Sequence, residues 1–260
     1  MAATAALLIR RYFSDRSGVA AFGLLFAIAG VLYAIGGSVF LLIDEPAEHQ
    51  TLPRAKLTEV FSRIRELLRK PSFRRFVIVQ SLLLPATQAL PFFSLFGRRV
   101  LHLETKTLGI LILTDAAAPV IGNFIWGKLA DARSNRFVIA AAGLCSLAAP
   151  ICLGAMYLLG RSSWFVIPLF ATIVFLIGAG SIGVDLATKN YILELAPKAS
   201  QRPLYIGIND ALVALPAILL VGVGAIIDLA GFVPVFMGLA FCAVIAIALT
   251  AGLPSRARSE

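Results

Sequence analysis

The chain has 260 residues, of which 59% are hydrophobic and 14% are charged, and its mean hydropathy is +0.90. So little charge in so apolar a chain excludes a soluble globular domain, and we expect an integral membrane protein. The net charge of +9 would suit nucleic-acid binding in a soluble chain. In a membrane protein the distribution of Lys and Arg among the loops instead indicates which loops face the cytoplasm, so we expect no nucleic-acid partner.

Apolar runs long enough to cross a bilayer, about 20 residues each, recur along the chain. The seven predicted spans are residues 18–43, 76–97, 107–127, 137–159, 164–184, 204–227 and 229–250. This pattern predicts an all-α, polytopic transmembrane helix bundle. We expect residues 1–43 to hold the tail of a preceding helix and the first span, residues 44–75 a cytoplasmic loop, and residues 76–260 a six-helix bundle.

Basic residues are concentrated in the connections on one side of these spans. That side holds the loop 44–75, the loops after the third and fifth spans, and the C-terminus. Because cytoplasmic loops are enriched in Lys and Arg, we expect this side to be cytoplasmic, as part of a multi-pass topology. Most of the bias comes from the loop 44–75.

That first loop contains a predicted amphipathic helix. Its apolar residues at helical spacing are Leu57, Val60, Phe61, Ile64, Leu67 and Leu68, whereas most of its basic residues fall elsewhere. Such a helix can lie on the inner membrane surface, attracted to anionic lipid, or pack on other cytoplasmic segments. The sequence leaves both interpretations open, and Pro71 is expected to end the helix.

The segment GKLADARSNR, residues 127–136, lies in the short connection between the third and fourth spans. It resembles the signature loop of the major facilitator superfamily, G-x-L-x-D-R-x-G-R-R, with Gly127, Leu129, Asp131 and Arg136 on matching positions. Glycine permits close approach of two helices, the aspartate can face a helix N-terminus, and the arginine can bind a carboxylate. The match is partial, since residues 132, 134 and 135 depart from the pattern and Arg133 compensates in part. The alternative is a cytoplasmic loop that simply collects basic residues.

A second segment, ELAPKASQRPLYIG at residues 194–207, follows the fifth span. It looks like the E-x-x-P, Arg and Gly pattern that many bacterial facilitator proteins carry in the corresponding loop. The resemblance implies a cytoplasmic gate formed by Asp131, Arg133, Arg136, Glu194 and Arg202, together with Gly127. It also implies that the spans are the sixth to twelfth of the family's twelve, the C-terminal half of a bacterial inner-membrane transporter.

The family's nested inverted repeats suggest a second motif at the opposite face of the membrane. Gly127-x-Leu129-x-Asp131 recurs as Gly224-x-Ile226-x-Asp228. In so apolar a chain, chance similarity is the alternative interpretation.

Polar residues inside the spans are the candidates for proton and substrate binding, because a charge at the bilayer centre is costly. Asp115 lies 12 residues before Gly127, roughly 18 Å along the helix and near mid-depth. It can carry a coupling proton or bind substrate, or be satisfied structurally by neighbouring helices. Gln80, Gln88 and Asn123 are weaker candidates that can line a cavity or bond between helices.

Two other polar pairs have expected structural roles. Asp185 and Lys189, four residues apart, are expected to neutralise each other near the cytoplasmic end. Asn209 and Asp210 lie at the start of the sixth span, where helix capping and gate contacts compete.

Other function classes fit less well. A retinal receptor is excluded because the last span holds no Lys, and no catalytic motif points to an enzyme. We expect no cofactor and no metal, and the three cysteines are expected to pack as small apolar side chains.

The implied function is secondary transport of a small solute by alternating access, as an antiporter or symporter, with protons as a candidate coupling ion. The expected partners are the lipid bilayer, the solute, and a missing N-terminal half or a second copy. The alternative is a truncated or non-transporting membrane scaffold, or a half-transporter that needs a partner half.

Overall fold

The computed structural model describes residues 18–40, 57–103, 105–159, 166–196 and 198–254, and within these ranges all regular secondary structure is helical. The chain divides into two compact units, Met1–Phe61 and Ser62–Glu260. In the first unit, α2 (Gly18–Phe40) has 23 residues and coincides with most of the first predicted span. The predicted tail of a preceding helix lies outside the described residues.

The amphipathic helix of the first loop is α3 (Leu57–Arg69), which crosses the division between the units. Leu67 is buried in the core of the second unit, and Ile64 and Leu68 pack against the same cluster. For these three side chains the structure therefore supports packing on the bundle. The helix ends at Arg69, as the proline at position 71 predicts, and Pro71 opens the next helix.

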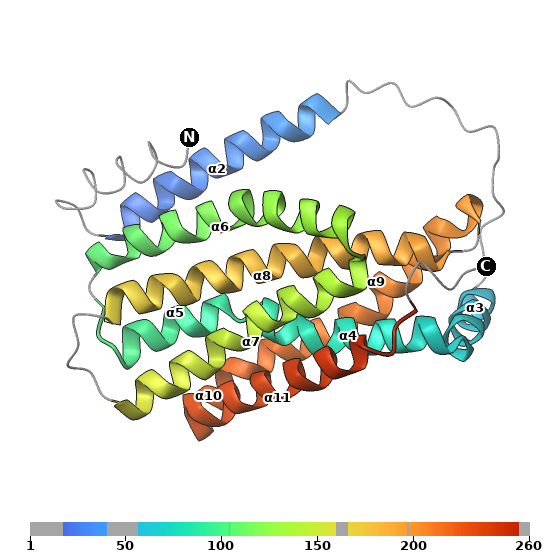
Figure 1. Ribbon diagram of the computed structural model, residues 1–260. Coiled ribbons are helices and arrows are strands. Elements are labelled where there is room, and N and C mark those ends of the chain that lie inside the picture. The colour runs from blue at the N-terminus through green and yellow to red at the C-terminus, as the bar shows by residue number, and fades with distance from the viewer. Residues whose placement is uncertain (1–17, 41–56, 104, 160–165, 197, 255–260) are drawn as a thin grey trace. The chain divides into compact units, whose positions relative to one another are not determined.

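Six helical segments in the described part of the chain are long and apolar enough to cross a membrane (Figure 1). They are α4 (Pro71–Thr87) with α5 (Leu90–Arg99), α6 (Thr105–Ala132), α7 (Asn135–Leu159), α8 (Val166–Leu195), α9 (Arg202–Leu219) with α10 (Val223–Ala230), and α11 (Phe232–Thr250). These segments begin at Pro71, five residues before the predicted start of the second span.

Two of the spans are interrupted. Between α4 and α5 the break falls at Gln88 and Ala89, flanked by Pro85 and Pro91, which cannot donate a backbone hydrogen bond. Between α9 and α10 one 3-10 turn, Leu220–Gly222, replaces the α-helix. Interruptions of this kind let a spanning helix bend without exposing many backbone groups.

The starts of α4, α7 and α9 and the ends of α6, α8 and α11 lie together at one end of the bundle, the basic end. Hydrogen bonds join these segments, for example from Lys70 Nζ to the hydroxyl of Tyr205 at 2.8 Å. The opposite end contains the ends of α5 and α10, which are joined by an ion pair described below.

Helix α8 is the central element, since it packs on α6 and α7 over much of its length and also contacts α4 and α9. Small residues permit this close packing: a Cβ at Gly180 would lie 2.7 Å from Ser146 Oγ and 2.9 Å from the carbonyl oxygen of Ala142 on α7. Helix α11 packs on α7 and α4 and closes the other side of the bundle.

Aromatic side chains fill the two ends of the core. Near the basic end, Phe73 meets Tyr205 and Phe76 meets Tyr191, with ring centroids 5.6 and 5.2 Å apart. Near the opposite end, the cluster consists of Phe93, Phe96, Phe232 and Phe236. These contacts hold the interrupted span α4–α5 against α8, α9 and α11.

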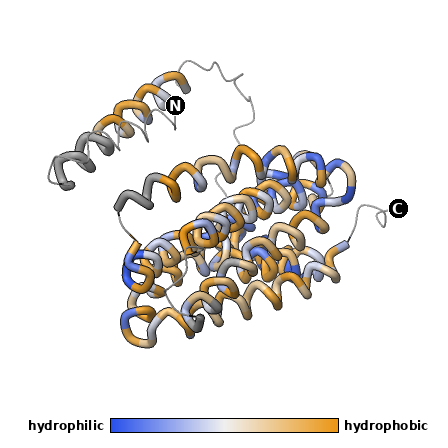
Figure 2. Tube along the Cα trace, turned by 60° about the vertical axis from the view of Figure 1, so that its left-hand side comes forward, coloured by the Kyte–Doolittle hydropathy of each residue, from blue (hydrophilic) through white to orange (hydrophobic). Residues whose placement is uncertain are grey.

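The helices of the second unit carry mainly hydrophobic residues along their length, and the most hydrophilic residues are gathered near the helix ends (Figure 2). The least buried spans are α9–α10 and α6. Their exposed apolar side chains include Val120, Phe124, Leu215, Leu219 and Val221. Such surfaces are compatible only with lipid or with another apolar protein surface.

Candidate functional site

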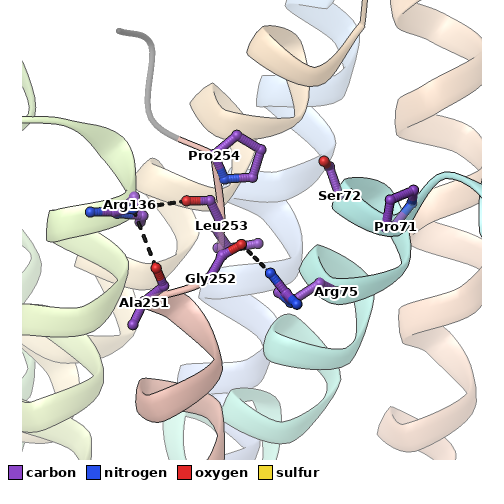
Figure 3. A pocket seen from close by; sticks show the side chains of 8 residues that line it. All are labelled: Pro71, Ser72, Arg75, Arg136, Ala251, Gly252, Leu253 and Pro254. Carbon is purple, nitrogen blue, oxygen red and sulfur yellow. Dashed lines mark hydrogen bonds between the residues drawn. The ribbon is translucent and has the colours of Figure 1, made fainter. Parts of the chain in front are cut away.

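The segment that directly follows α11, residues 251–254, is held through its carbonyl groups by side chains from three other helices, two of which are drawn in Figure 3. Arg136, in the first turn of α7, donates from Nη1 to the carbonyl oxygens of Leu253 at 2.9 Å and Ala251 at 3.4 Å. Arg75 of α4 donates to the carbonyl of Gly252, and the hydroxyl of Tyr191 on α8 donates to Pro254 at 3.0 Å. The last carbonyls of α11 itself accept from the backbone N–H groups of residues 251–253, so these side chains instead fix the segment that follows the helix.

Gly252 lies directly against the Arg75 side chain. A Cβ at that position would overlap Nη1 of Arg75 and lie 2.8 Å from its Cζ. The guanidinium group therefore lies directly against the backbone, where any side chain at residue 252 would displace it. The sequence pattern did not single out Arg75, although its place within the basic Arg74–Arg75 pair before a span was a usable signal.

The predicted gate residues are brought together only in part. Asn135 is buried and donates from Nδ2 to Oε1 of Glu194 at 2.8 Å. This hydrogen bond joins the start of α7 to the end of α8. Arg136 lies at the same end and donates to backbone carbonyls of residues 251 and 253, directly after α11.

The other predicted gate residues lie at the surface. Asp131, Arg133 and Arg202 are exposed and form no ion pair within 4.0 Å among the described residues. The Arg133 guanidinium instead lies over the ring of Phe137, 5.6 Å from its centroid. A Cβ at Gly127 would meet nothing within 4 Å, so the close helix approach expected there is absent from the described part of the chain.

Asp115 lies on α6 beside α8. A Cβ at Gly178 of α8 would be 3.4 Å from Asp115 Oδ1 and 2.8 Å from the Cβ of Ala118, so the missing side chain makes room for the carboxyl group. Helix α6 has 28 residues and is about 42 Å long, and Asp115 lies about 26 Å from its C-terminal end. The carboxyl group is therefore near the middle of the helix and half-buried.

Asp185 and Lys189 of α8 form the predicted ion pair, with Lys189 Nζ 2.7 Å from Asp185 Oδ2. Their side chains are 55% and 73% exposed on the surface of the bundle. Helix α8 continues to Leu195, so Asp185 lies about 15 Å before its end, deeper than the predicted location near the cytoplasmic end. Gly178, Asp185 and Lys189 fall within about 40° of one another around the helix.

An exposed ion pair at this depth restricts what can cover it. Hydrocarbon does not solvate charges, and charged side chains inside spans face a water-filled cavity or a polar protein surface. The stripe of α8 that carries Asp185 and Lys189 is therefore a candidate border of such a polar region. Asp115, next to Gly178, extends this polar stripe toward the other end of the bundle.

The amide candidates differ in their surroundings. Gln88 is exposed at the break between α4 and α5, and Asn123 is exposed on α6. Gln80 Oε1 is buried and has no hydrogen-bond partner among the described residues, and the same holds for Oδ1 of Asn209. Buried polar atoms are nearly always satisfied, which sets these two oxygens apart from the other polar atoms of the core.

Asn209 lies in the second turn of α9 and is buried, so it is not the capping residue that its predicted position at the start of the span suggested. Its Nδ2 donates to Asp210 Oδ1 at 3.2 Å. Helix α9 starts at Arg202, so residue 209 lies more than one turn inside it.

At the opposite end, Arg99 at the end of α5 donates to Asp228 Oδ1 of α10 at 2.6 Å. Asp228 is the acidic residue of the second, inverted motif, so the two motifs differ in their contacts: Asp228 has an arginine partner from another span, whereas Asp131 is exposed.

A bundle of six apolar helices that are each long enough to cross a bilayer defines a multi-pass membrane protein. The sequence model of the Major Facilitator Superfamily matches residues 1–167. The chain therefore belongs to the Major Facilitator Superfamily, whose members are membrane transporters rather than enzymes. No curated protein sequence matches the chain significantly.

Proposed function

We propose that the protein takes part in secondary active transport of a small solute by alternating access, with the solute pathway along the polar stripe of α8. The observation that carries this proposal is the Asp185–Lys189 ion pair, which is exposed about 15 Å from the end of a spanning helix. A pair in this position is stable when water or a polar solute covers it and costly against lipid.

Asp115 is the proposed coupling residue. It lies near mid-depth, half-buried beside Gly178, and no described residue forms an ion pair with it. Transfer of a carboxyl group between a water-filled cavity and a closed helix contact changes how well its charge is solvated. Such a group can take up a proton on one side of the membrane and release it on the other, which would make the protein an antiporter or symporter.

The basic end is the proposed cytoplasmic gate of a bacterial inner-membrane protein, with the C-terminus in the cytoplasm. Arg136 and Glu194 support the proposal through their contacts at the ends of α7, α8 and α11. Asp131, Arg133 and Arg202 are exposed there and are available to a partner surface. Gly127, which contacts no neighbouring helix in the described residues, leaves room for such a surface.

A second six-helix bundle is the proposed partner, because a facilitator pathway lies between two halves and the described spans supply one. The weakly buried apolar faces of α6 and α9–α10 favour this view. That half is either the N-terminal part of the same transporter or a second copy. A non-transporting scaffold or an unpaired half-transporter is the alternative, and the mass of the native gene product decides whether a longer chain exists.

The test is solute flux in vesicles that contain the complete native protein, under an imposed pH gradient and across a broad solute panel. We expect Asp115→Asn to abolish proton-coupled flux while exchange of the same solute on both sides continues. Asp228→Asn, the same chemical change at the opposite end of the bundle, serves as the matched control and keeps coupled flux. Coupled flux that survives in Asp115→Asn would refute the role of Asp115, and no flux of any solute would favour the scaffold alternative.

A further inference from the structure

A cavity of about 510 Å³ opens at the basic end, between the start of α4, the start of α7 and the end of α11 (Figure 3). Its lining consists of Pro71, Ser72, Arg75, Arg136 and residues 251–254. The volume falls in the range of small-molecule sites, about 300–1,000 Å³. The cavity thus has room for a phosphate ester with part of its glycerol backbone.

Two cationic side chains give the cavity its charge. Arg75 and Arg136 reach it from α4 and α7, and both use Nη1 for their bonds to the carbonyls of residues 251–253, directly after α11. A guanidinium group has five N–H donors, and the remaining ones on these two side chains have no acceptor among the described residues. Further hydrogen bonds to a ligand are therefore available without breaking those that hold α11.

The charge balance of the cavity favours an anion. The end of a helix contributes roughly half a negative elementary charge, whereas the two guanidinium groups carry two full positive charges. The described residues that line the cavity include no carboxylate. The neighbouring exposed side chains Arg69 and Arg74 add to the positive potential.

The cavity also lies at the level where a bilayer presents phosphate groups. It is formed by the ends of spanning helices, and α7 and α11 carry exposed apolar side chains away from their contacts with the bundle. These side chains are Phe137, Leu144, Met237, Phe241 and Val244. Because such faces require lipid, the lipid headgroups of the adjoining leaflet come next to the start of α7 and the end of α11.

We infer that this cavity binds the phosphate group of an anionic ligand through Arg75 and Arg136. Arginine binds phosphate with two parallel, charge-assisted hydrogen bonds, which makes it well suited to this role. The phosphate can come from an acidic phospholipid headgroup or from a free phosphate ion or ester. Because Arg75 and Arg136 also hold α11, an occupied site ties the end of that helix to α4 and α7.

The experiment measures thermal unfolding of the complete protein, purified in non-ionic detergent. The added ligands are phosphatidylglycerol, phosphatidylcholine, or inorganic phosphate. Native mass spectrometry on the same samples counts the retained lipids. If a lipid headgroup is the source, phosphatidylglycerol raises the unfolding temperature and stays bound, whereas the other two ligands have little effect. If free phosphate is the source, inorganic phosphate gives the stabilisation at a comparable occupancy.

Variants test whether the stabilisation by phosphatidylglycerol or phosphate depends on the cavity. Loss of one guanidinium group in Arg75→Gln is expected to lower the affinity for the stabilising ligand about tenfold. Arg75→Lys, which keeps the charge, is expected to retain part of that affinity. Arg74→Gln is the matched control, since Arg74 is the adjacent exposed arginine and does not line the cavity. Each shift is measured against the ligand-free protein of the same variant, which separates binding from any loss of basal stability.

Two results would overturn the inference. One is an equal affinity for phosphatidylglycerol or phosphate in the native protein, Arg75→Gln and Arg136→Gln. The other is equal stabilisation by phosphatidylglycerol and phosphatidylcholine with no effect of phosphate, which would indicate a general lipid effect on the apolar surface.

Discussion

The indole N–H of Trp126 on α6 donates to the carbonyl oxygen of Ala179 on α8 at 2.7 Å, in the buried interior of the helix pair. Gly183, one turn further along α8, makes this bond possible. A Cβ on Gly183 would lie 2.7 Å from both Nε1 and Cε2 of Trp126, and 2.7 Å from the Cβ of Ala142 on α7. Helices α6, α7 and α8 thus meet at Gly183, and the Trp126 ring occupies the space that a side chain at residue 183 would need.

Gly183→Ala is therefore expected to destabilise the bundle, even though alanine is the better helix former. The added methyl group must displace the Trp126 ring or separate α8 from α7, which costs about 1–3 kcal/mol. Thermal unfolding in detergent, followed by tryptophan fluorescence, measures the loss. A red-shifted emission in the folded state would accompany displacement of the ring.

Gly238→Ala is the control for this prediction, because Gly238 lies inside α11 and a Cβ there meets nothing within 4 Å. Helix propensity alone makes this change neutral or stabilising, by up to about 1 kcal/mol. Equal effects of the two substitutions would show that the contact at Gly183 is not the cause.

Thiol reactivity tests whether the Asp185–Lys189 stripe borders water. In a variant whose native cysteines 145, 152 and 242 are replaced, Asp185→Cys and Lys189→Cys are expected to react with a membrane-impermeant thiol reagent in vesicles. Reaction requires the thiolate and access to water, and a polar cavity supplies both. Leu144→Cys on α7, at a side chain that is 54% exposed, is expected to stay unreactive because lipid covers it.

The contrast between these positions is informative because side-chain exposure alone would make all three reactive. Unreactive cysteines at both 185 and 189, from either side of the membrane, would mean that protein or lipid seals this stripe. The proposed solute pathway along α8 would then be wrong.

The Arg99–Asp228 ion pair is expected to contribute little to stability, despite its short distance of 2.6 Å. Both side chains are more than half exposed, and ion pairs of this kind contribute about 0–1 kcal/mol. Asp228→Asn should therefore lower the unfolding temperature only slightly in low salt, and the difference should shrink as salt is added. A large, salt-independent loss would show that the pair is desolvated in the folded protein and closes the opposite end of the bundle.

Much of the fold could be predicted from the chain alone, because the property that defines a membrane span is local. Each span must bury its own backbone hydrogen bonds and present apolar side chains to lipid, so its length and composition suffice to find it. The second to seventh predicted spans all coincide with spanning helices, and α2 coincides with most of the first. The i,i+4 spacing of Asp185 and Lys189 likewise predicted their ion pair.

Contacts between spans were decided only by the tertiary structure. Arg136 matched a charged gate motif, yet its partners are backbone carbonyls some 115 residues away, at the end of α11. No local pattern encodes that pairing, since it depends on which helix ends meet. Arg75, which makes the equivalent contact from α4, was not singled out for the same reason.

Sequence by itself thus determined that the protein is an all-α membrane bundle with helices at these positions, because hydrophobic length and turn residues act within one segment. The tertiary structure decided which polar groups face each other and which face outward. The fit of Trp126 against Gly183 and the exposure of the Asp185–Lys189 pair depend on the rotation and packing of separate helices. Those quantities are set by side-chain interlocking across the bundle, to which every neighbouring helix contributes.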